Sequence, residues 1–221
     1  MSKYRPFVAI AIIVAVLVIV GFVLIRARRS QLVFDDGLAG VQTAPSNQAT
    51  PRRPSDVVVT LEEFGDYQCP PCGLLHPTLK SLRQEFGPNL NFVFRNLPLT
   101  SIHKNALVAA QAAEAARVQN KFWEMHDLLY ENQKLWEEDI NPRSIFIKFA
   151  SDLGLDVPRF TKDMGDTQIQ LRIQADQDAA AQMGIVGTPT IVIEGRRMTP
   201  EATNPNGIRK GIEYMLSRKS S

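Results

Sequence analysis

The sequence has very few cysteines: its 221 residues include two, Cys69 and Cys72, in a single Cys-Pro-Pro-Cys motif. Because both belong to one motif, no cysteine is left to build a framework of structural disulfides. Two cysteines separated by two residues are typical of redox sites and of zinc sites. The motif is therefore the first candidate for chemistry in this chain.

The larger part of the chain also lacks an excess of basic residues. Residues 1–55 contain seven Lys and Arg against two Asp and Glu, whereas residues 56–221 contain eighteen against twenty-one. A nucleic-acid-binding surface therefore has no electrostatic support in the larger part. The arginines at positions 26, 28 and 29 are expected to contact lipid headgroups instead.

One uncharged apolar stretch, residues 7–25, lies between Lys3 and Arg5 on one side and Arg26 on the other. At about 1.5 Å per residue, such a helix matches a hydrocarbon core about 30 Å thick. A cleaved secretory signal is the alternative, but its apolar region normally covers about 7 to 15 residues. The sequence predicts an uncleaved transmembrane anchor within residues 1–29. The flanking charges are nearly balanced and do not set its orientation.

Residues 30–55 are polar and rich in proline, which predicts an extended linker. The remaining residues, 56–221, are enough for one domain. Periodicity predicts a buried strand over 57–64, a helix from Cys69, a strand over 90–97, a largely helical stretch, a strand over 190–193 and a closing helix over 206–217. This order predicts an α/β fold with an inserted helical part at about 103–185.

The cysteine pair is predicted to lie where the first strand ends and a helix begins. Unpaired backbone N–H groups and the helix dipole stabilise a thiolate there. Cys69 is expected at the exposed tip as the attacking thiol, and Cys72, one turn later, as the buried resolving thiol. Pro70 suits the first helical turn. Pro71 removes another N–H near Cys69, so the couple is expected to be less oxidising than one with histidine at that position.

The cysteine motif has two other possible interpretations, a zinc site and an inert pair. A closed zinc site needs four ligands, and the sequence has no second clustered pair, although His76, His103 or His126 could add imidazoles. The cysteines could also be inert. We expect no metal site, and we expect the three histidines to be packing or surface residues.

These residues resemble a known family. The segment from Glu63 to Cys72, followed much later by Gly187-Thr188-Pro189-Thr190, resembles the DsbA-like branch of the thioredoxin superfamily. The similarity covers roughly residues 57–216 and implies a thioredoxin-like fold with an inserted helical subdomain. The Phe-Trp-Glu-Met-His stretch at 122–126 also resembles the start of that subdomain.

The resemblance implies roles for individual residues. Pro189 would be the cis-proline beside the cysteine pair, and Thr188 would offer backbone groups to an extended substrate; an ordinary turn is the alternative. Glu63 would be the acid beneath the pair, with its pKa raised by burial. An exposed acid at the end of the strand is the alternative for Glu63, and Asp66 is its rival. Pro77 would be the structural proline that kinks the helix.

The resemblance implies an enzyme, a thiol:disulfide oxidoreductase whose redox group is the Cys69–Cys72 disulfide and which needs no cofactor. Its partners would be exported proteins with free thiols and a quinone-linked membrane oxidase, or a thiol carrier if the enzyme is a reductant. A non-catalytic peptide-binding module is the rival from another class. We expect a monomer at the cell membrane, with its catalytic domain on the periplasmic or outer face, because disulfide formation needs an oxidising compartment.

Overall fold

The computed structural model describes residue 19, residues 34–35 and residues 58–219. Apart from Ile19, the predicted anchor at 7–25 lies outside the described residues, and so does most of the predicted linker. Within the part of the chain that the structure describes, no helix is both long enough and apolar enough to cross a membrane.

The described residues form a five-stranded mixed sheet with the order β1-β5-β4-β2-β3. The strands are β1 (Phe34–Asp35), β2 (Val59–Gly65), β3 (Leu90–Asn96), β4 (Thr190–Ile193) and β5 (Arg196–Met198). The central strand β2 runs parallel to β3 and antiparallel to β4. In this register Glu63 lies between Phe94 of β3 and Ile191 of β4, so it is surrounded by apolar neighbours in the sheet.

Side-chain alternation along β2 gives the sheet two apolar faces. Val59 and Leu61 pack with α2 (Pro70–Phe86) and α9 (Pro205–Lys219) on one face. Phe64 and Val192 pack with α8 (Thr167–Gln182) on the other. Both faces are therefore covered by helices, as the almost uninterrupted burial of β2 requires.

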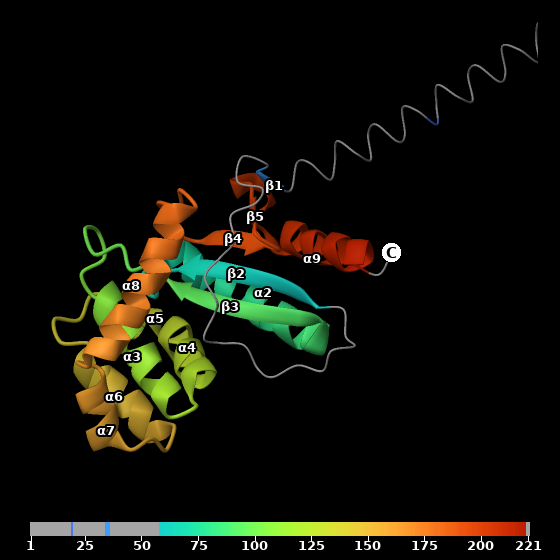
Figure 1. The fold of residues 1–221 in the computed structure, drawn as a ribbon. Helices are drawn as coiled ribbons and strands as arrows, with labels where there is room; N and C mark the ends of the chain where they lie inside the picture. Colours follow the sequence, from blue (N-terminus) through green and yellow to red (C-terminus); the bar gives the residue numbers. More distant parts are fainter. Residues whose placement is uncertain (1–18, 20–33, 36–57, 220–221) are drawn as a thin grey trace, which may run out of the picture.

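The remaining α-helices follow β3 in the chain. They are α3 (Ala106–Val118), α4 (Phe122–Glu131), α5 (Gln133–Trp136), α6 (Arg143–Asp152) and α7 (Val157–Asp163). Figure 1 shows them gathered beside the carboxyl ends of β2 and β3. The alanine-rich face of α3 packs closely into this group because its side chains are small. Asp156 and Asp166 cap α7 and α8 by accepting hydrogen bonds from backbone N–H groups of the first helical turns.

The structure confirms the predicted succession of a strand, a helix, a strand, a helical stretch, a strand and a helix. It also contains two strands that were not predicted. A tight turn with positive φ at Glu194 and Gly195 returns the chain into β5, whose sequence Arg-Arg-Met lacks the apolar alternation of a typical strand. The other strand is β1, which pairs with β5 and lies in the segment predicted as linker.

Candidate active site

The cysteine motif occupies the junction predicted for it. β2 ends at Gly65 and α2 begins at Pro70, with Cys69 as the N-cap residue. The backbone N–H of Cys69 donates to the carbonyl of Asp66 at 3.1 Å, which closes the turn between strand and helix. Both prolines lie in the first turn of α2, where a missing N–H costs little. Because Cys69 is the N-cap residue, the positive end of the helix dipole is directed at it.

Cys69 is more enclosed than the sequence interpretation predicted. Its side chain is 4% exposed rather than lying at an exposed tip, and Cys72 is fully buried. The physical reason is the loop before β4, whose Thr188 carbonyl accepts a hydrogen bond from the Cys69 thiol at 3.5 Å. Both cysteines are free thiols, so the structure corresponds to the reduced dithiol form.

The pKa values of the two thiols are shifted in opposite directions. The pKa of Cys69 is lowered to about 6, chiefly by a hydrogen bond from the Cys72 side chain and further by the backbone N–H of Cys72, against the opposing effect of burial. Burial raises the pKa of Cys72 well above its ordinary value. The thiolate is the nucleophilic form of cysteine, and near neutral pH these shifts favour the thiolate at Cys69 and the protonated thiol at Cys72.

Glu63 lies buried beneath the pair. Its side chain is 1% exposed, and its Oε1 makes no hydrogen bond with any described residue. Burial, together with the nearby charge of Cys69, raises the pKa of Glu63 to about 8. Glu63 is therefore not the exposed acid that was its alternative. Its carboxyl is neutral below about pH 8 and can exchange a proton in the physiological range.

Asp66, the rival to Glu63, is buried but fully engaged in hydrogen bonds. Its carboxylate accepts from the backbone N–H groups of Gln68 and Leu99 and contacts His103 Nδ1 at 2.7 Å. These contacts fix the turn that leads into Cys69 and join it to the loop after β3. The arrangement suits a positioning residue better than a proton carrier.

The helical part holds the same turn from the other side. Gln133 Nε2 donates to the carbonyls of Tyr67 and Cys69 at 2.7 and 3.0 Å. Gln68 accepts from the backbone N–H of Asn105 and donates to the carbonyl of Glu137. Sequence reasoning missed Gln133 and Asn105 because they are distant in the chain and belong to no motif. The glycine at position 73 is an indirect sign of the contact with Gln133, because a side chain at that position would collide with Gln133.

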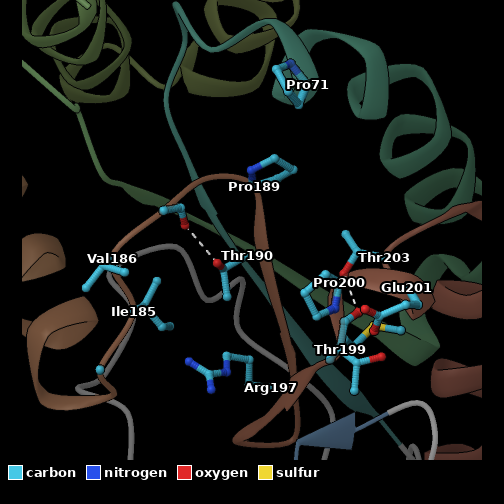
Figure 2. Close-up of a pocket in the computed structure, with 13 residues that line it drawn as sticks. Pro71, Ile185, Val186, Pro189, Thr190, Arg197, Thr199, Pro200, Glu201 and Thr203 are labelled. Atoms are coloured by element: carbon cyan, nitrogen blue, oxygen red, sulfur yellow. Dashed lines mark hydrogen bonds between the residues drawn. The ribbon is translucent and has the colours of Figure 1, made fainter. Parts of the chain in front are cut away.

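The loop before β4 completes the site. The Thr188–Pro189 peptide bond is cis, as the resemblance implied. The hydroxyl of Thr190 donates to the carbonyl of Gly187 at 2.7 Å and closes the loop (Figure 2). Thr188 Oγ1 is buried and makes no hydrogen bond with the described residues. Pro77 lies inside α2, as expected.

A pocket of about 900 Å³ opens beside this loop. Figure 2 shows Pro71 and Pro189 at one end of the pocket, with Arg197 and Pro200 toward the other. Val186, in its wall, is 90% exposed. Sequence reasoning did not find the pocket because the fold builds it from the 184–190 loop, β5 and the segment that follows, which includes η3 (Pro200–Ala202).

The histidines lie apart from the sulfur atoms. His103 contacts Asp66, while His76 and His126 are buried between α2 and α4. His76 and His126 form a group of potential metal ligands with Asp127, and neither cysteine belongs to that group. The structure therefore gives no support to a zinc site that combines the cysteine pair with these imidazoles.

The chain is similar to known proteins in sequence. The thioredoxin family model matches residues 55–213. A curated relative, Na(+)/H(+) antiporter NhaA 1 of Salinispora arenicola, is 42% identical over 146 residues, which are 66% of this chain and 22% of the relative. The chain thus matches about a fifth of the length of that protein.

Two solved structures have a similar fold. DsbA from Xylella fastidiosa superposes with a TM-score of 0.62 at 22% identity, covering 76% of this chain and 89% of DsbA. BdbD from Bacillus subtilis superposes with a TM-score of 0.64 at 24% identity, covering 74% of this chain and 90% of BdbD. The family match covers more than half of the chain and shows that it belongs to the thioredoxin family, and the two superpositions show that it has the same fold as DsbA and BdbD.

Proposed function

We propose that this chain is a thiol:disulfide oxidoreductase that forms disulfides in exported proteins through Cys69 and Cys72. The observation that carries the proposal is the opposed acidity of the two thiols, with the pKa of Cys69 lowered to about 6 and that of Cys72 raised. A pair that served only packing would not need a stabilised thiolate next to a buried neutral thiol. The peptide-binding module with incidental cysteines is for this reason the weaker interpretation.

The proposed reaction begins with the Cys69–Cys72 disulfide. A substrate thiolate attacks Sγ of Cys69, a mixed disulfide forms, and the bond to Cys72 breaks. Cys72 leaves with the electron pair and takes a proton, for which the neutral carboxyl of Glu63 is the buried donor. The second substrate thiolate then attacks the substrate sulfur of the mixed disulfide, and Cys69 leaves as a thiolate. Two electrons pass from the substrate to the enzyme.

The direction of electron flow depends on how well the reduced form is stabilised. A Cys69 thiolate with a pKa of about 6 favours the dithiol, which makes the couple an oxidant. Pro71 acts in the opposite sense, because it removes one N–H donor near the sulfur. The thiolate stabilisation supports the oxidase, and a reductant fed by a membrane thiol carrier is the alternative.

Substrate is proposed to bind across the loop that contains Pro189. Thr188 offers backbone groups beside Cys69 that suit an extended peptide. The pocket next to Pro71 and Pro189, with exposed Val186 in its wall, fits an apolar side chain of that peptide. This binding mode places a substrate cysteine at Cys69 without requiring one particular sequence around it.

We further propose that residues 7–25 hold the enzyme at the outer face of the cell membrane, where a quinone-linked partner reoxidises it. A tether raises the local concentration of such a partner. The antiporter relative supports this setting, because a homologous region there belongs to a protein named as a membrane transporter. Antiport itself is not carried over, since the match covers only 22% of that protein.

The proposal is tested by oxidation of a reduced, unfolded model protein by the oxidised chain, with the Cys69→Ser variant as the control. We expect stoichiometric disulfide transfer by the native chain and none by the variant. Thiol trapping of Cys69 and Cys72 in cells tests the direction. A mostly oxidised pair supports the oxidase, whereas a mostly reduced pair would establish the reductant.

A further inference from the structure

A second cluster of reactive side chains lies between α2 and α4, outside the set of residues assigned to the redox reaction. His76 follows Cys72 by one helical turn on α2, and His126 and Asp127 are adjacent on α4. One ligand atom from each of the three residues lies within 4.8 Å of the other two. The two histidines are 3% and 2% exposed, so the protein has taken both imidazoles out of water.

Two atoms of this cluster have no hydrogen-bonding partner among the described residues. They are His76 Nε2 and Asp127 Oδ1, which face each other at 3.5 Å. Buried polar atoms are nearly always hydrogen bonded, so an unpartnered pair calls for an explanation. A bound cation between the nitrogen and the oxygen would satisfy both atoms.

The surroundings of the histidines suit metal ligands. His126 Nδ1 is hydrogen bonded to the Tyr67 hydroxyl at 3.0 Å, which fixes the ring, as outer hydrogen bonds do in metal sites. His76 stacks on Tyr130 with ring centroids 5.1 Å apart.

Cations at the rim oppose metal binding. Lys80 Nζ lies 2.9 Å from Asp127 Oδ2 and 2.7 Å from Glu131 Oε1, and Arg83 Nη2 lies 3.9 Å from Asp127 Oδ2. These contacts use Oδ2 of Asp127 and leave Oδ1 directed at His76. Glu131 Oε1 is also 4.0 Å from His76 Nε2, so a fourth potential ligand atom is near. An ion would therefore compete with Lys80 for the two carboxylates.

We propose that His76, His126 and Asp127 form a binding site for a divalent transition metal ion, with zinc as the best match. Two imidazoles and one carboxylate are a recurrent zinc ligand set, in which the fourth position is left to water or another ligand. A metal at this point joins the helix that carries the redox cysteines to the inserted helical part. Its occupancy would hold α2 and α4 together one turn behind Cys72.

The test is a titration of the full-length chain in detergent with Zn²⁺, followed by calorimetry. The chain is used with its Cys69–Cys72 disulfide formed, because the free thiols would themselves bind zinc. We expect one zinc ion per chain and a loss of affinity of about tenfold or more in His76→Asn and in Asp127→Asn. His103→Gln changes the third histidine of the chain, outside the cluster, and is expected to bind zinc like the native protein.

Lys80→Met distinguishes a built site from adventitious binding. Removal of the competing ammonium is expected to tighten zinc binding, whereas adventitious binding at a surface imidazole would not respond in this way. Unfolding curves recorded with a chelator identify variants that fold, and Asp127→Asn carries the test if His76→Asn does not fold. Absence of binding, or binding that survives Asp127→Asn unchanged, would overturn the proposal.

Discussion

Cys69 and Cys72 are one helical turn apart, yet their surroundings move their thiol pKa values in opposite directions. The largest effect on Cys69 is the hydrogen bond that the Cys72 side chain donates to it. As a thiol, Cys72 thus makes its partner more acidic, and in the proposed mechanism it also resolves the mixed disulfide. The reactivity of Cys69 is a property of the pair and not of the helix dipole alone.

This dependence predicts different acidities for two variants of Cys72. In Cys72→Ala the donor is lost, and we expect the pKa of Cys69 to rise from about 6 toward its ordinary value of 9. In Cys72→Ser a hydroxyl can still donate, so the pKa is expected to stay lower than in Cys72→Ala. The measurement is the rate of alkylation of Cys69 as a function of pH. Identical profiles for the two variants would show that the Cys72 side chain is not the main cause.

Glu63 makes stability depend on pH. Because burial raises its pKa from 4.5 to about 8, the folded state favours the protonated acid. Its contribution to stability is fully present below about pH 4.5 and is lost as pH rises through about 8. At about 1.4 kcal/mol per pKa unit, the loss amounts to several kcal/mol.

We expect Glu63→Gln to remove this dependence. With the disulfide formed, so that no thiol titrates, the native chain should lose stability between pH 5 and pH 8 by about several kcal/mol more than the variant does. Glu138→Gln, at an exposed position, should behave like the native chain. The measurement is denaturant unfolding at a series of pH values. If the free energy of unfolding of the native chain varied with pH no more than that of the Glu63→Gln variant, the result would contradict the buried position of this acid.

At the scale of the elements, a buried charged network joins the sheet to α8. Arg95 of β3 bonds Glu62 of β2 at 2.8 Å and Asp176 of α8 at 3.2 Å. The side chains of all three residues are at most 10% exposed. Removing the cation would leave two carboxylates buried without their partner, which is far more costly than the loss of a surface pair.

Arg95→Met is accordingly expected to lower the free energy of unfolding by about 3 to 5 kcal/mol. The matched control is Lys148→Met, which removes an exposed ion pair with Asp152 and should cost about 0.5 kcal/mol or less. Urea unfolding followed by circular dichroism measures both. A loss of similar size in the two variants would mean that the network does not fix α8 on the sheet.

The sequence was most informative where periodicity and motif agreed. The apolar run before the motif predicted β2, and the helical periodicity from Cys69 onward predicted α2. The β4–β5 hairpin was not predicted for two reasons. Glu194 adopts a positive φ, which nothing in the sequence indicates, and Arg196 and Arg197 break the apolar alternation that is typical of a strand. The role of Gln133 was not predicted because its side chain, which is distant in the sequence, donates hydrogen bonds to carbonyls of the turn at Cys69.

The enclosure of Cys69 is another feature that could not be predicted from the sequence, because it depends on contacts with a distant segment. The motif predicted a reactive thiol, but how far the thiol is covered depends on Thr188, which is 119 residues away. Only the folded chain brings this loop to the cysteine. Local chemistry can therefore be inferred from a motif, whereas access to it depends on distant segments.

At the scale of the whole molecule, the proposed tether makes its own prediction. The full-length chain should sediment with membranes and resist carbonate extraction, because residues 7–25 are long and apolar enough to span. Replacing Val14 and Val18 with arginine should release the chain, since each charge costs about 2.5 to 3.5 kcal/mol at the centre of a membrane helix. Oxidation of a model protein by the released variant should be unchanged. Membrane retention of the double variant would show that another part of the chain anchors it.

The central claim is that Cys69 exchanges disulfides through a covalent intermediate that Cys72 resolves. The most direct test is incubation of Cys72→Ser with a peptide that contains a disulfide, followed by mass mapping of the adduct. We predict a stable mixed disulfide on Cys69, because its thiolate attacks and no second thiol can release the peptide. Absence of an adduct with a folded Cys72→Ser chain, or an equal adduct with Cys69→Ser at Cys72, would contradict the account.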